Sequence, residues 1–291
     1  LVSQRGLAVQ PATRLLTGNA LARLGDQRPG VRVIEKDGVR LPDIAWGEVV
    51  PAGRYQIGGG EKAYRPLAAQ EIEIVRPYRL ARYPVTYAQF QCFVEAADFA
   101  DPRWWQGMPA EDKDWNDNLQ KVQEIGEQWF QLPNRPRDNV SWYQAVAFCR
   151  WLGDKLGEVI DLPYEWELEV AARYPDGWAY PWGDEFETTR ANTDESRIGQ
   201  TTAVGVFADG ANAALNLYDL SGNVWEWCRN KYSDMRDGEI DESQARRVLR
   251  GGSWFDYHYS ARAVARNHAR PIGRPTSLGF RVVVGASSPI S

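Results

Sequence analysis

The 291-residue chain is long enough for one large domain or two ordinary ones, and its composition of 43% hydrophobic and 25% charged residues is that of a globular protein. Its formal net charge of −5 disfavours nucleic acid or an anionic membrane as a partner. No apolar run approaches the ~20 residues of a membrane-spanning helix. The first residues also lack the apolar core and cleavage site of a signal peptide, so a cytoplasmic location is predicted.

The first part of the chain differs in character from the rest. Residues 1–45 are predicted to be an N-terminal appendage, the remnant of an upstream domain, with a short helical pattern of Leu and Ala over 15–24. Residues 46–291 form one aromatic-rich domain. Apolar and polar residues alternate over 46–59 and 71–85, which predicts strands of an antiparallel sheet.

Three helices are predicted within the main domain. Thr86 is placed to cap a helix that continues to about residue 97. Ser141 precedes a second helix, and Gln144 three residues later completes a capping box. A third helix follows Pro163, since proline suits the first helical turn.

Six motifs occur in a fixed order along the chain: VSWYQAVAFCRWLGDKLG, LPYEWELEVAAR, YPWGDEF, NLYDLSGNVWEWC, VLRGGSW and LGFRVV. Together they resemble the formylglycine-generating enzyme (sulfatase-modifying factor) family over residues 46–284. The resemblance implies an α+β domain with the C-type lectin fold, built from small twisted antiparallel sheets, two to three helices and much irregular loop. One departure is Tyr164, which stands where the family has a helix-capping Thr.

The residues that would make the chain an enzyme of this family are absent. Its oxidases hold copper with two cysteines just after GGS, and the matching positions here are Asp256 and Ala261. No cysteine follows Cys228. The family's sulfoxide synthases hold iron with three histidines, whereas this chain has two, His258 and His268. An iron triad of both histidines with Asp256 is disfavoured, so no catalytic cofactor is predicted.

Other catalytic arrangements are also disfavoured. The chain has no GxSxG motif. Glu165 and Glu167 are predicted to be surface charges on the third helix. The three cysteines, Cys92, Cys149 and Cys228, are predicted to be buried reduced thiols. We therefore predict that the chain is not an enzyme.

The resemblance implies a structural calcium site in DLSGNVWEW. Its ligands would be the carboxylates of Asp219 and Glu226 and the carbonyls of Gly222 and Val224, all of them the hard oxygen donors that Ca²⁺ prefers. The alternative is that the two carboxylates accept hydrogen bonds from loop backbone. The sequence leaves both open.

The segment from Phe255 to Leu278 has an unusual composition. It contains no Lys, Glu, Gln, Met or Trp, although 13 Trp occur elsewhere in the chain. Each residue type that remains has a codon ending in a pyrimidine. Residues 251–281 thereby resemble the variable region in the variable proteins of diversity-generating retroelements, which starts near GGSW and ends near GFR. The resemblance implies that Arg262, Arg266 and Arg274 are fixed scaffold.

Tyr with Ser, Asn and Asp is a composition typical of adaptable binding loops. The alternative is a strand with Phe255, Tyr257 and Tyr259 facing inward. We predict a non-enzymatic ligand-binding protein whose partner is an unknown protein or other macromolecule; the alternative function is a formylglycine-generating-type oxidase, a sulfoxide synthase-like enzyme or an inactive relative of these. The predicted ligand-binding residues are Phe255, Asp256, Tyr257, His258, Tyr259, Ser260, Asn267 and His268.

Overall fold

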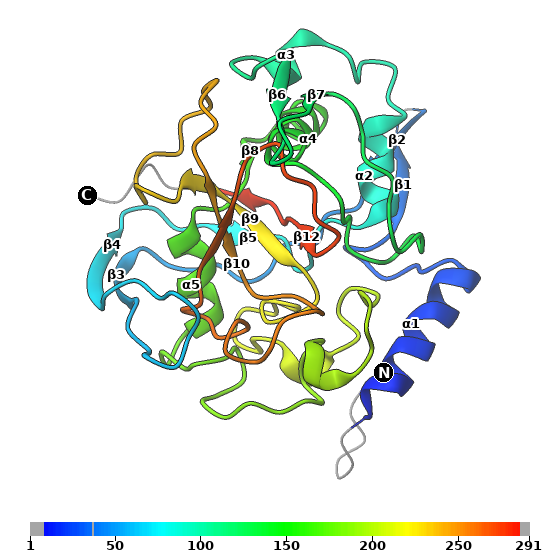
Figure 1. Cartoon of the computed structure of the whole chain (residues 1–291). Coiled ribbons are helices and arrows are strands. Elements are labelled where there is room, and N and C mark those ends of the chain that lie inside the picture. The colour runs from blue at the N-terminus through cyan, green and yellow to red at the C-terminus, as the bar shows by residue number, and fades with distance from the viewer. Residues whose placement is uncertain (1–8, 37, 286–291) are drawn as a thin grey trace.

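The helices of the main domain begin at the predicted caps in the computed structural model, which describes residues 9–36 and 38–285 (Figure 1). Thr86 caps α2 (Tyr87–Val94) and Ser141 caps α4 (Trp142–Leu156), each in a capping box with the Gln three residues later. At α5 (Glu165–Arg173), Tyr164 provides no side-chain cap, and its backbone N–H instead donates to Glu167. The described residues also form α1 (Pro11–Leu24), the four-residue α3 (Pro102–Trp105), which the sequence did not predict, and two 3₁₀ turns, η1 (Asp194–Ser196) and η2 (Ala208–Gly210).

The strands of the described residues form five small sheets. The largest has the order β11-β10-β9-β12, and its β9–β12 pair is parallel while the other two pairs are antiparallel. Its strands are β9 (Trp225–Lys231), β10 (Arg247–Arg250), β11 (Asn267–Ala269) and β12 (Leu278–Gly279). Both edge strands therefore come from the predicted variable region.

The four other sheets are shorter. β3 (Gly53–Ile57) and β4 (Gln70–Ile74) form the antiparallel pair predicted from the alternating segments. A three-stranded sheet joins the C-terminal end of the domain to its middle. The remaining strands are β1 (Val33–Lys36) with β2 (Val39–Pro42), β6 (Glu111–Lys113) with β7 (Leu119–Lys121), and β5 (Arg79–Leu80), β13 (Val283–Val284) and β8 (Ile160–Asp161). The predicted α+β architecture of small sheets, helices and long loops is confirmed.

The N-terminal residues contact the main domain through two features. Helix α1 lies at one side of the molecule in Figure 1 and buries Arg14, Gly18 and Ala22, rather than the predicted leucine pattern. Arg14 donates to the carbonyl of Val206 at 2.6 Å and pairs with Asp209 at 2.6 Å. The β1–β2 hairpin packs on α2 and buries a leucine in the main core. None of the helices in the described residues is long and apolar enough to span a bilayer.

Aromatic rings fill the core between α2, α4 and residues 251–285, which we call the C-terminal segment. Phe280 is fully buried, and its ring meets those of Phe90 and Phe148 edge-on at centroid distances of 6.1 and 5.3 Å. Edge-to-face pairs of this kind stabilise a core beyond the area that they bury. The core therefore fixes the end of the predicted variable region just before β13.

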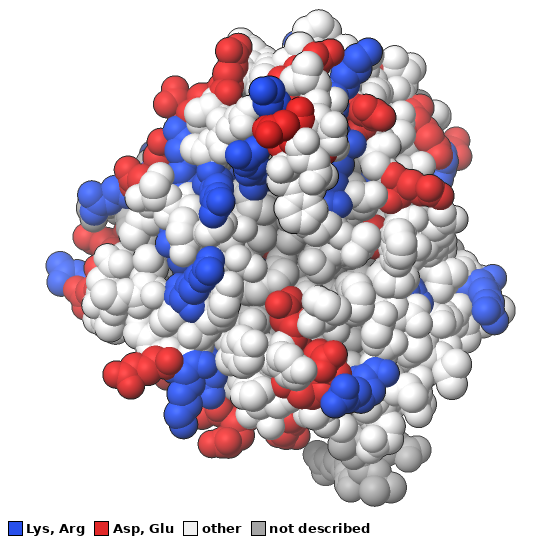
Figure 2. All heavy atoms as spheres, viewed as in Figure 1, with Lys and Arg blue, Asp and Glu red and all other residues white. Residues whose placement is uncertain are grey.

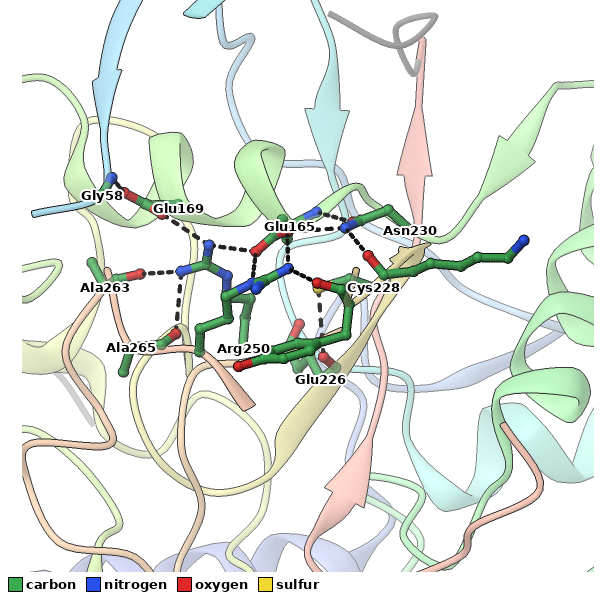
Figure 3. A network of polar contacts seen from close by, with 12 residues as sticks. Gly58, Glu165, Glu169, Glu226, Cys228, Asn230, Arg250, Ala263 and Ala265 are labelled. Atoms are coloured by element: carbon green, nitrogen blue, oxygen red, sulfur yellow. Dashed lines mark hydrogen bonds and ion pairs between the residues drawn. The ribbon is translucent and has the colours of Figure 1, made fainter. Parts of the chain in front are cut away.

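A buried network of two arginines and two glutamates joins α5 to the C-terminal segment (Figure 3). Arg250 Nη2 lies 2.7 Å from Glu165 Oε2 and 2.9 Å from Glu169 Oε2. Arg266 binds the same Glu165 carboxylate through two hydrogen bonds of 2.6 and 2.8 Å. The prediction that Glu165 and Glu167 are surface charges is wrong, because α5 turns both toward the interior and both are fully buried.

The same network holds backbone that has no sheet partner. Arg250 Nη1 donates to the carbonyl of Ala263 at 3.4 Å and to that of Ala265 at 3.2 Å. Glu169 Oε1 accepts the backbone N–H of Gly58 at 2.6 Å. Figure 3 shows Arg250 between these carbonyls and the helix that carries the two glutamates. The network thus connects four parts of the chain, namely α5, β10, the loop after β3 and the C-terminal segment.

The charges in this network depend on one another. Burial raises the pKa of the Glu165 carboxyl, but the charge of Arg250 and the hydrogen bonds of Arg266 outweigh it, so the net pKa lies below its ordinary value of 4.5. A buried ion that loses its partner is strongly unfavourable, since nothing replaces the water it gave up. Glu165 is therefore the carboxylate that the two arginines share, while Arg250 also pairs with Glu169.

Replacing Glu165 by Gln is expected to lower the free energy of unfolding by about 3–5 kcal/mol, because the buried Arg266 loses its counter-charge and Arg250 keeps only Glu169. The matched control is Glu71→Gln on β4, whose exposed carboxylate lies 3.5 Å from Arg54 and whose loss should change stability by less than ~0.5 kcal/mol. Urea unfolding of both variants measures the difference.

The pH dependence gives a second readout. Since folding depresses the pKa of Glu165, its stabilisation is present above pH 4.5 and is lost as the pH falls through the folded-state value. Acidification should therefore destabilise the natural chain more steeply than Glu165→Gln. Equal stability of Glu165→Gln and Glu71→Gln would contradict the role given to the network.

Candidate ligand-binding surface

The segment between β10 and β11 is a series of turns that exposes three aromatic side chains. Phe255 is 70% exposed, Tyr257 50% and Tyr259 41%. The alternative of a strand with these rings facing inward is wrong, because the segment has no strand backbone between Gly251 and Arg266. The Ser260 N–H donates to the carbonyl of Tyr257 at 2.9 Å, and that of Ala261 to the carbonyl of His258 at 3.1 Å. These turns leave the three rings exposed to solvent.

Six of the eight predicted residues lie at the surface. His258 is exposed like the three aromatic residues, and Asn267 and His268 are half-buried on the edge strand β11. We call this set the display surface: Phe255, Tyr257, His258, Tyr259, Asn267 and His268. In Figure 1 the segment that carries it is coloured orange to red and loops across the front of the lower and left part of the domain.

Two predicted residues have a structural role instead. Ser260 is only 3% exposed, because its backbone packs against Gly252 in the turn. Asp256 is half-buried, and its Oδ2 accepts hydrogen bonds from Trp225 Nε1 at 2.8 Å and from the hydroxyl of Ser253. Burial raises the pKa of Asp256, and both hydrogen bonds oppose this shift. The prediction that Ser260 is displayed is therefore wrong, and the Asp256 carboxylate is directed to Trp225 and Ser253.

The loop after β3 forms part of the same surface, which the sequence did not predict. The Tyr64 N–H donates to the carbonyl of Tyr259 at 3.1 Å, and the Arg266 N–H donates to the carbonyl of Tyr64 at 2.9 Å. The rings of Tyr64 and Tyr259 are 6.5 Å apart. Gly60 is required in this loop, since a β-carbon there would lie 2.9 Å from Val264. The Gly58–Gly60 run was the only sequence signal for this contact.

A second contact holds His258. Glu195 Oε1 lies 2.8 Å from both the backbone N and the Nδ1 of His258. The ring of Phe186 lies 5.2 Å from the imidazole. Glu195 and Phe186 come from the irregular region before β9, where residue spacing gives no indication of which side chains meet.

The predicted scaffold residues differ in burial. Arg266 is buried, and so is Phe280 near the end of the predicted variable region. Trp254, Arg262 and Arg274 are half-buried. The guanidinium of Arg262 lies 5.2 Å from the ring of Tyr180, and Arg274 donates to a backbone carbonyl at 3.1 Å. The three arginines therefore contact parts of the fold outside residues 251–281.

The chain matches the family of the sulfatase-modifying factor enzyme 1-like domain over residues 35–286. It belongs to the sulfatase-modifying factor family. A relative named inactive C-alpha-formylglycine-generating enzyme 2, from Bos taurus, is 30% identical over 284 residues, which cover 82% of this chain and 88% of the relative. The formylglycine-generating enzyme of Thermomonospora curvata is also 30% identical, over 82% of this chain and 93% of the enzyme.

Two solved structures share the fold of this family member. PvdO from Pseudomonas aeruginosa superimposes with a TM-score of 0.63 at 22% identity, over 89% of this chain and 99% of PvdO. Treponema denticola variable protein 1 superimposes with a TM-score of 0.63 at 20% identity, over 87% of this chain and 98% of that protein. The predicted C-type lectin fold of the formylglycine-generating-enzyme type is confirmed.

The positions where the resemblance places the copper ligands of the family's oxidases have other roles here. Asp256 holds Trp225, and Ala261 is fully buried. The three thiols lie on α2, α4 and β9, all buried, as predicted. Burial raises the pKa of the Cys92 thiol to about 11. The described residues contain no group of three His, Cys, Asp or Glu side chains arranged to hold a metal ion.

A cleft of about 700 Å³ opens among residues 174–218, before β9. It includes Trp182, whose ring stacks on Tyr180 at 5.1 Å, and the Tyr180 hydroxyl donates to the carbonyl of His258. No histidine or cysteine is among the described residues that line it. Its lining combines aromatic and amide side chains with the charged Asp176, Arg190 and Asp209.

The residues expected to bind calcium do not fit that ion. Both oxygens of Glu226 accept hydrogen bonds of 2.6 Å from Arg281, so a cation would have to displace a buried guanidinium. Asp219 Oδ2 accepts the backbone N–H of Gly205 at 2.6 Å. Burial raises the pKa of Asp219 to about 6. The two carboxylates therefore act as hydrogen-bond acceptors, Asp219 for loop backbone and Glu226 for Arg281.

We expect a chelator to leave the melting temperature of the purified protein unchanged, because Arg281 already neutralises Glu226. A ligand that binds only the folded state raises the melting temperature by mass action. A drop in melting temperature in chelator that added Ca²⁺ restores would contradict this expectation and support the ligand set implied by the family.

The double replacement Tyr257→Ser with Tyr259→Ser is expected to change the free energy of unfolding by no more than ~0.5 kcal/mol per site, as for other surface positions. Phe280→Ala is the buried control and should cost roughly 3–5 kcal/mol, because it leaves a cavity among packed rings. Denaturant unfolding of the two variants makes the comparison. If the tyrosine variant unfolds as readily as Phe280→Ala, the tyrosines belong to the core.

Proposed function

We propose that this member of the sulfatase-modifying factor family is a non-enzymatic ligand-binding protein. In this proposal the display surface contacts a protein or other macromolecular ligand, and retroelement mutagenesis of residues 251–281 diversifies it. The observation that carries the proposal is the exposure of Phe255, Tyr257 and Tyr259. The backbone that follows them is held by hydrogen bonds from the buried Arg250.

The chemistry of the surface suits binding. The rings of Tyr257 and Tyr259 stack at 6.1 Å, and the ring of Tyr64 extends the group. Rigid aromatic side chains with polar tips supply a large contact area at a small loss of conformational entropy. A group of exposed rings is otherwise unfavourable in water, so a covering partner accounts for it.

The positions that would vary are separated from those that hold the fold. The six residues of the display surface leave the arginine–glutamate network untouched, because Arg250 and Arg266 bind Glu165 and backbone carbonyls rather than displayed side chains. The superposition with a structure named variable protein 1 and the relative named an inactive enzyme both agree with a binding role.

The alternative is a formylglycine-generating-type oxidase or a sulfoxide synthase-like enzyme. It is favoured by the 30% identity to the formylglycine-generating enzyme of Thermomonospora curvata. Against it stand Asp256 and Ala261 at the positions matching the copper-binding cysteines, and the presence of two histidines in the chain. An inactive relative of these enzymes with an undiversified surface is the remaining possibility.

The DNA around the gene tests the proposal. We expect a nearby repeat almost identical to the codons of residues 255–278, in which every difference falls at an adenine of the repeat, together with a reverse transcriptase gene. This is the arrangement that would produce a segment without Lys, Glu, Gln, Met or Trp codons. A complete gene neighbourhood without such a repeat would rule out diversification and leave the alternative.

A further inference from the structure

Two arginines from distant parts of the chain converge on His268 at the edge of the display surface. Arg246 Nη1 lies 3.2 Å from His268 Nε2 and 3.4 Å from its Nδ1. Arg65 Nη1 lies 3.3 Å from the same Nε2. Arg65 follows Tyr64 in the loop after β3, Arg246 directly precedes β10, and His268 lies on β11. Both arginines are exposed, so the group opens to solvent.

This group has an excess of hydrogen-bond donors. A guanidinium only donates, and a neutral imidazole accepts at one ring nitrogen. That single lone pair is shared between two arginines. Among the described residues, no carboxylate oxygen lies within 4.0 Å of the guanidinium nitrogens of Arg65 or Arg246. In contrast, Arg54 on the neighbouring strand β3 pairs with Glu71.

The surroundings keep the imidazole neutral and in place. Burial lowers the pKa of His268, and the positive charges of Arg246 and Arg65 lower it further. The ring of Tyr232 packs edge-on against the imidazole at 4.3 Å. The guanidinium of Arg266 lies 4.1 Å from that Tyr232 ring. His268 is therefore connected through Tyr232 to the buried network at Glu165.

The backbone at Arg65 is also unusual. Arg65 has a φ of +48°, a left-handed conformation that residues with a β-carbon seldom adopt. The two backbone hydrogen bonds of the preceding Tyr64 hold this turn against the C-terminal segment. The turn directs the guanidinium of Arg65 over the Tyr64 ring, at 5.0 Å, and toward His268. Strained backbone of this kind persists where the surrounding structure over-determines it.

We propose that Arg65, Arg246 and His268 form a subsite that binds an oxyanion of the ligand. The anion would be a carboxylate, phosphate or sulfate group, whose oxygens accept the N–H groups that the protein leaves without an acceptor. Figure 2 shows that on the face in view Lys and Arg gather on one side of a central hollow of uncharged atoms, with carboxylates nearer its lower rim. The positive charges on that side of the hollow favour the approach of a negatively charged group.

The subsite deepens the proposed function and rests on it. Arg65 and Arg246 lie outside residues 251–281, so they stay constant while the displayed residues vary. A constant pair of arginines beside a variable surface would give successive versions of the protein one shared contact, whereas His268 itself lies among the residues proposed to vary. The display surface would then select among ligands that all carry a negative group at the matching place.

The two histidines of the chain allow a direct test by NMR with isotope-labelled histidine. We expect inorganic phosphate, added at constant ionic strength and neutral pH, to shift the His268 ring signals in a saturable way. His258 should not respond, because Glu195 already contacts it. In the double variant Arg65→Gln with Arg246→Gln, binding should weaken at least tenfold, whereas the control Arg54→Gln should bind as the natural chain does.

Acetate in a parallel titration distinguishes the source of the oxyanion. Saturable shifts with both anions point to a carboxylate of the ligand, and a response to phosphate alone points to a phosphate or sulfate group. The absence of a saturable shift at His268, or its persistence in a double variant with an unchanged melting temperature, would overturn the proposal. If the double variant melts early, Arg65→Gln and Arg246→Gln are titrated singly. The NMR titration tests anion binding whether or not residues 251–281 are diversified. Failure of the proposed function would instead appear in the DNA around the gene.

Discussion

The carboxylate of Glu165 is the group on which the architecture of this protein depends. It binds Arg266 through two hydrogen bonds and Arg250 through an ion pair of 2.7 Å, with every partner buried. Arg250 in turn holds the carbonyls of Ala263 and Ala265, which have no strand beside them. Hydrogen bonds from a buried arginine thus replace the backbone hydrogen bonds that a neighbouring strand would otherwise make. Such an arrangement is demanding, since removing Glu165 leaves Arg266 buried without a counter-charge.

This construction separates what holds the segment from what the segment shows to solvent. The edge strands β11 and β12, the buried Phe280 and the arginine network fix the backbone of the C-terminal segment. The exposed rings of Phe255, Tyr257 and Tyr259 take no part in the network. A family whose named relatives include both enzymes and an inactive form can in this way keep one fold while the surface changes.

Local sequence rules were sufficient for features set by neighbours in the chain. The caps at Thr86 and Ser141 were predictable because a capping box needs only residues three positions apart. The burial of Glu165 was not, because its partners Arg250 and Arg266 lie far along the chain. The burial of Ser260 was not predictable for a related reason. It depends on how the turn packs against the backbone of Gly252, which residue composition does not indicate.

Hydrogen exchange at the amides of Ala263 and Arg266 is the most direct test of the central claim that the network holds the segment whatever it displays. The measurement compares the natural chain with one in which Phe255, Tyr257 and Tyr259 are all replaced by Ser. The Ala263 amide donates to the carbonyl of Ala179 and that of Arg266 to Tyr64, so both should remain as protected as in the natural chain. A large loss of protection at both amides would show that the displayed rings themselves hold the backbone, and would contradict the account.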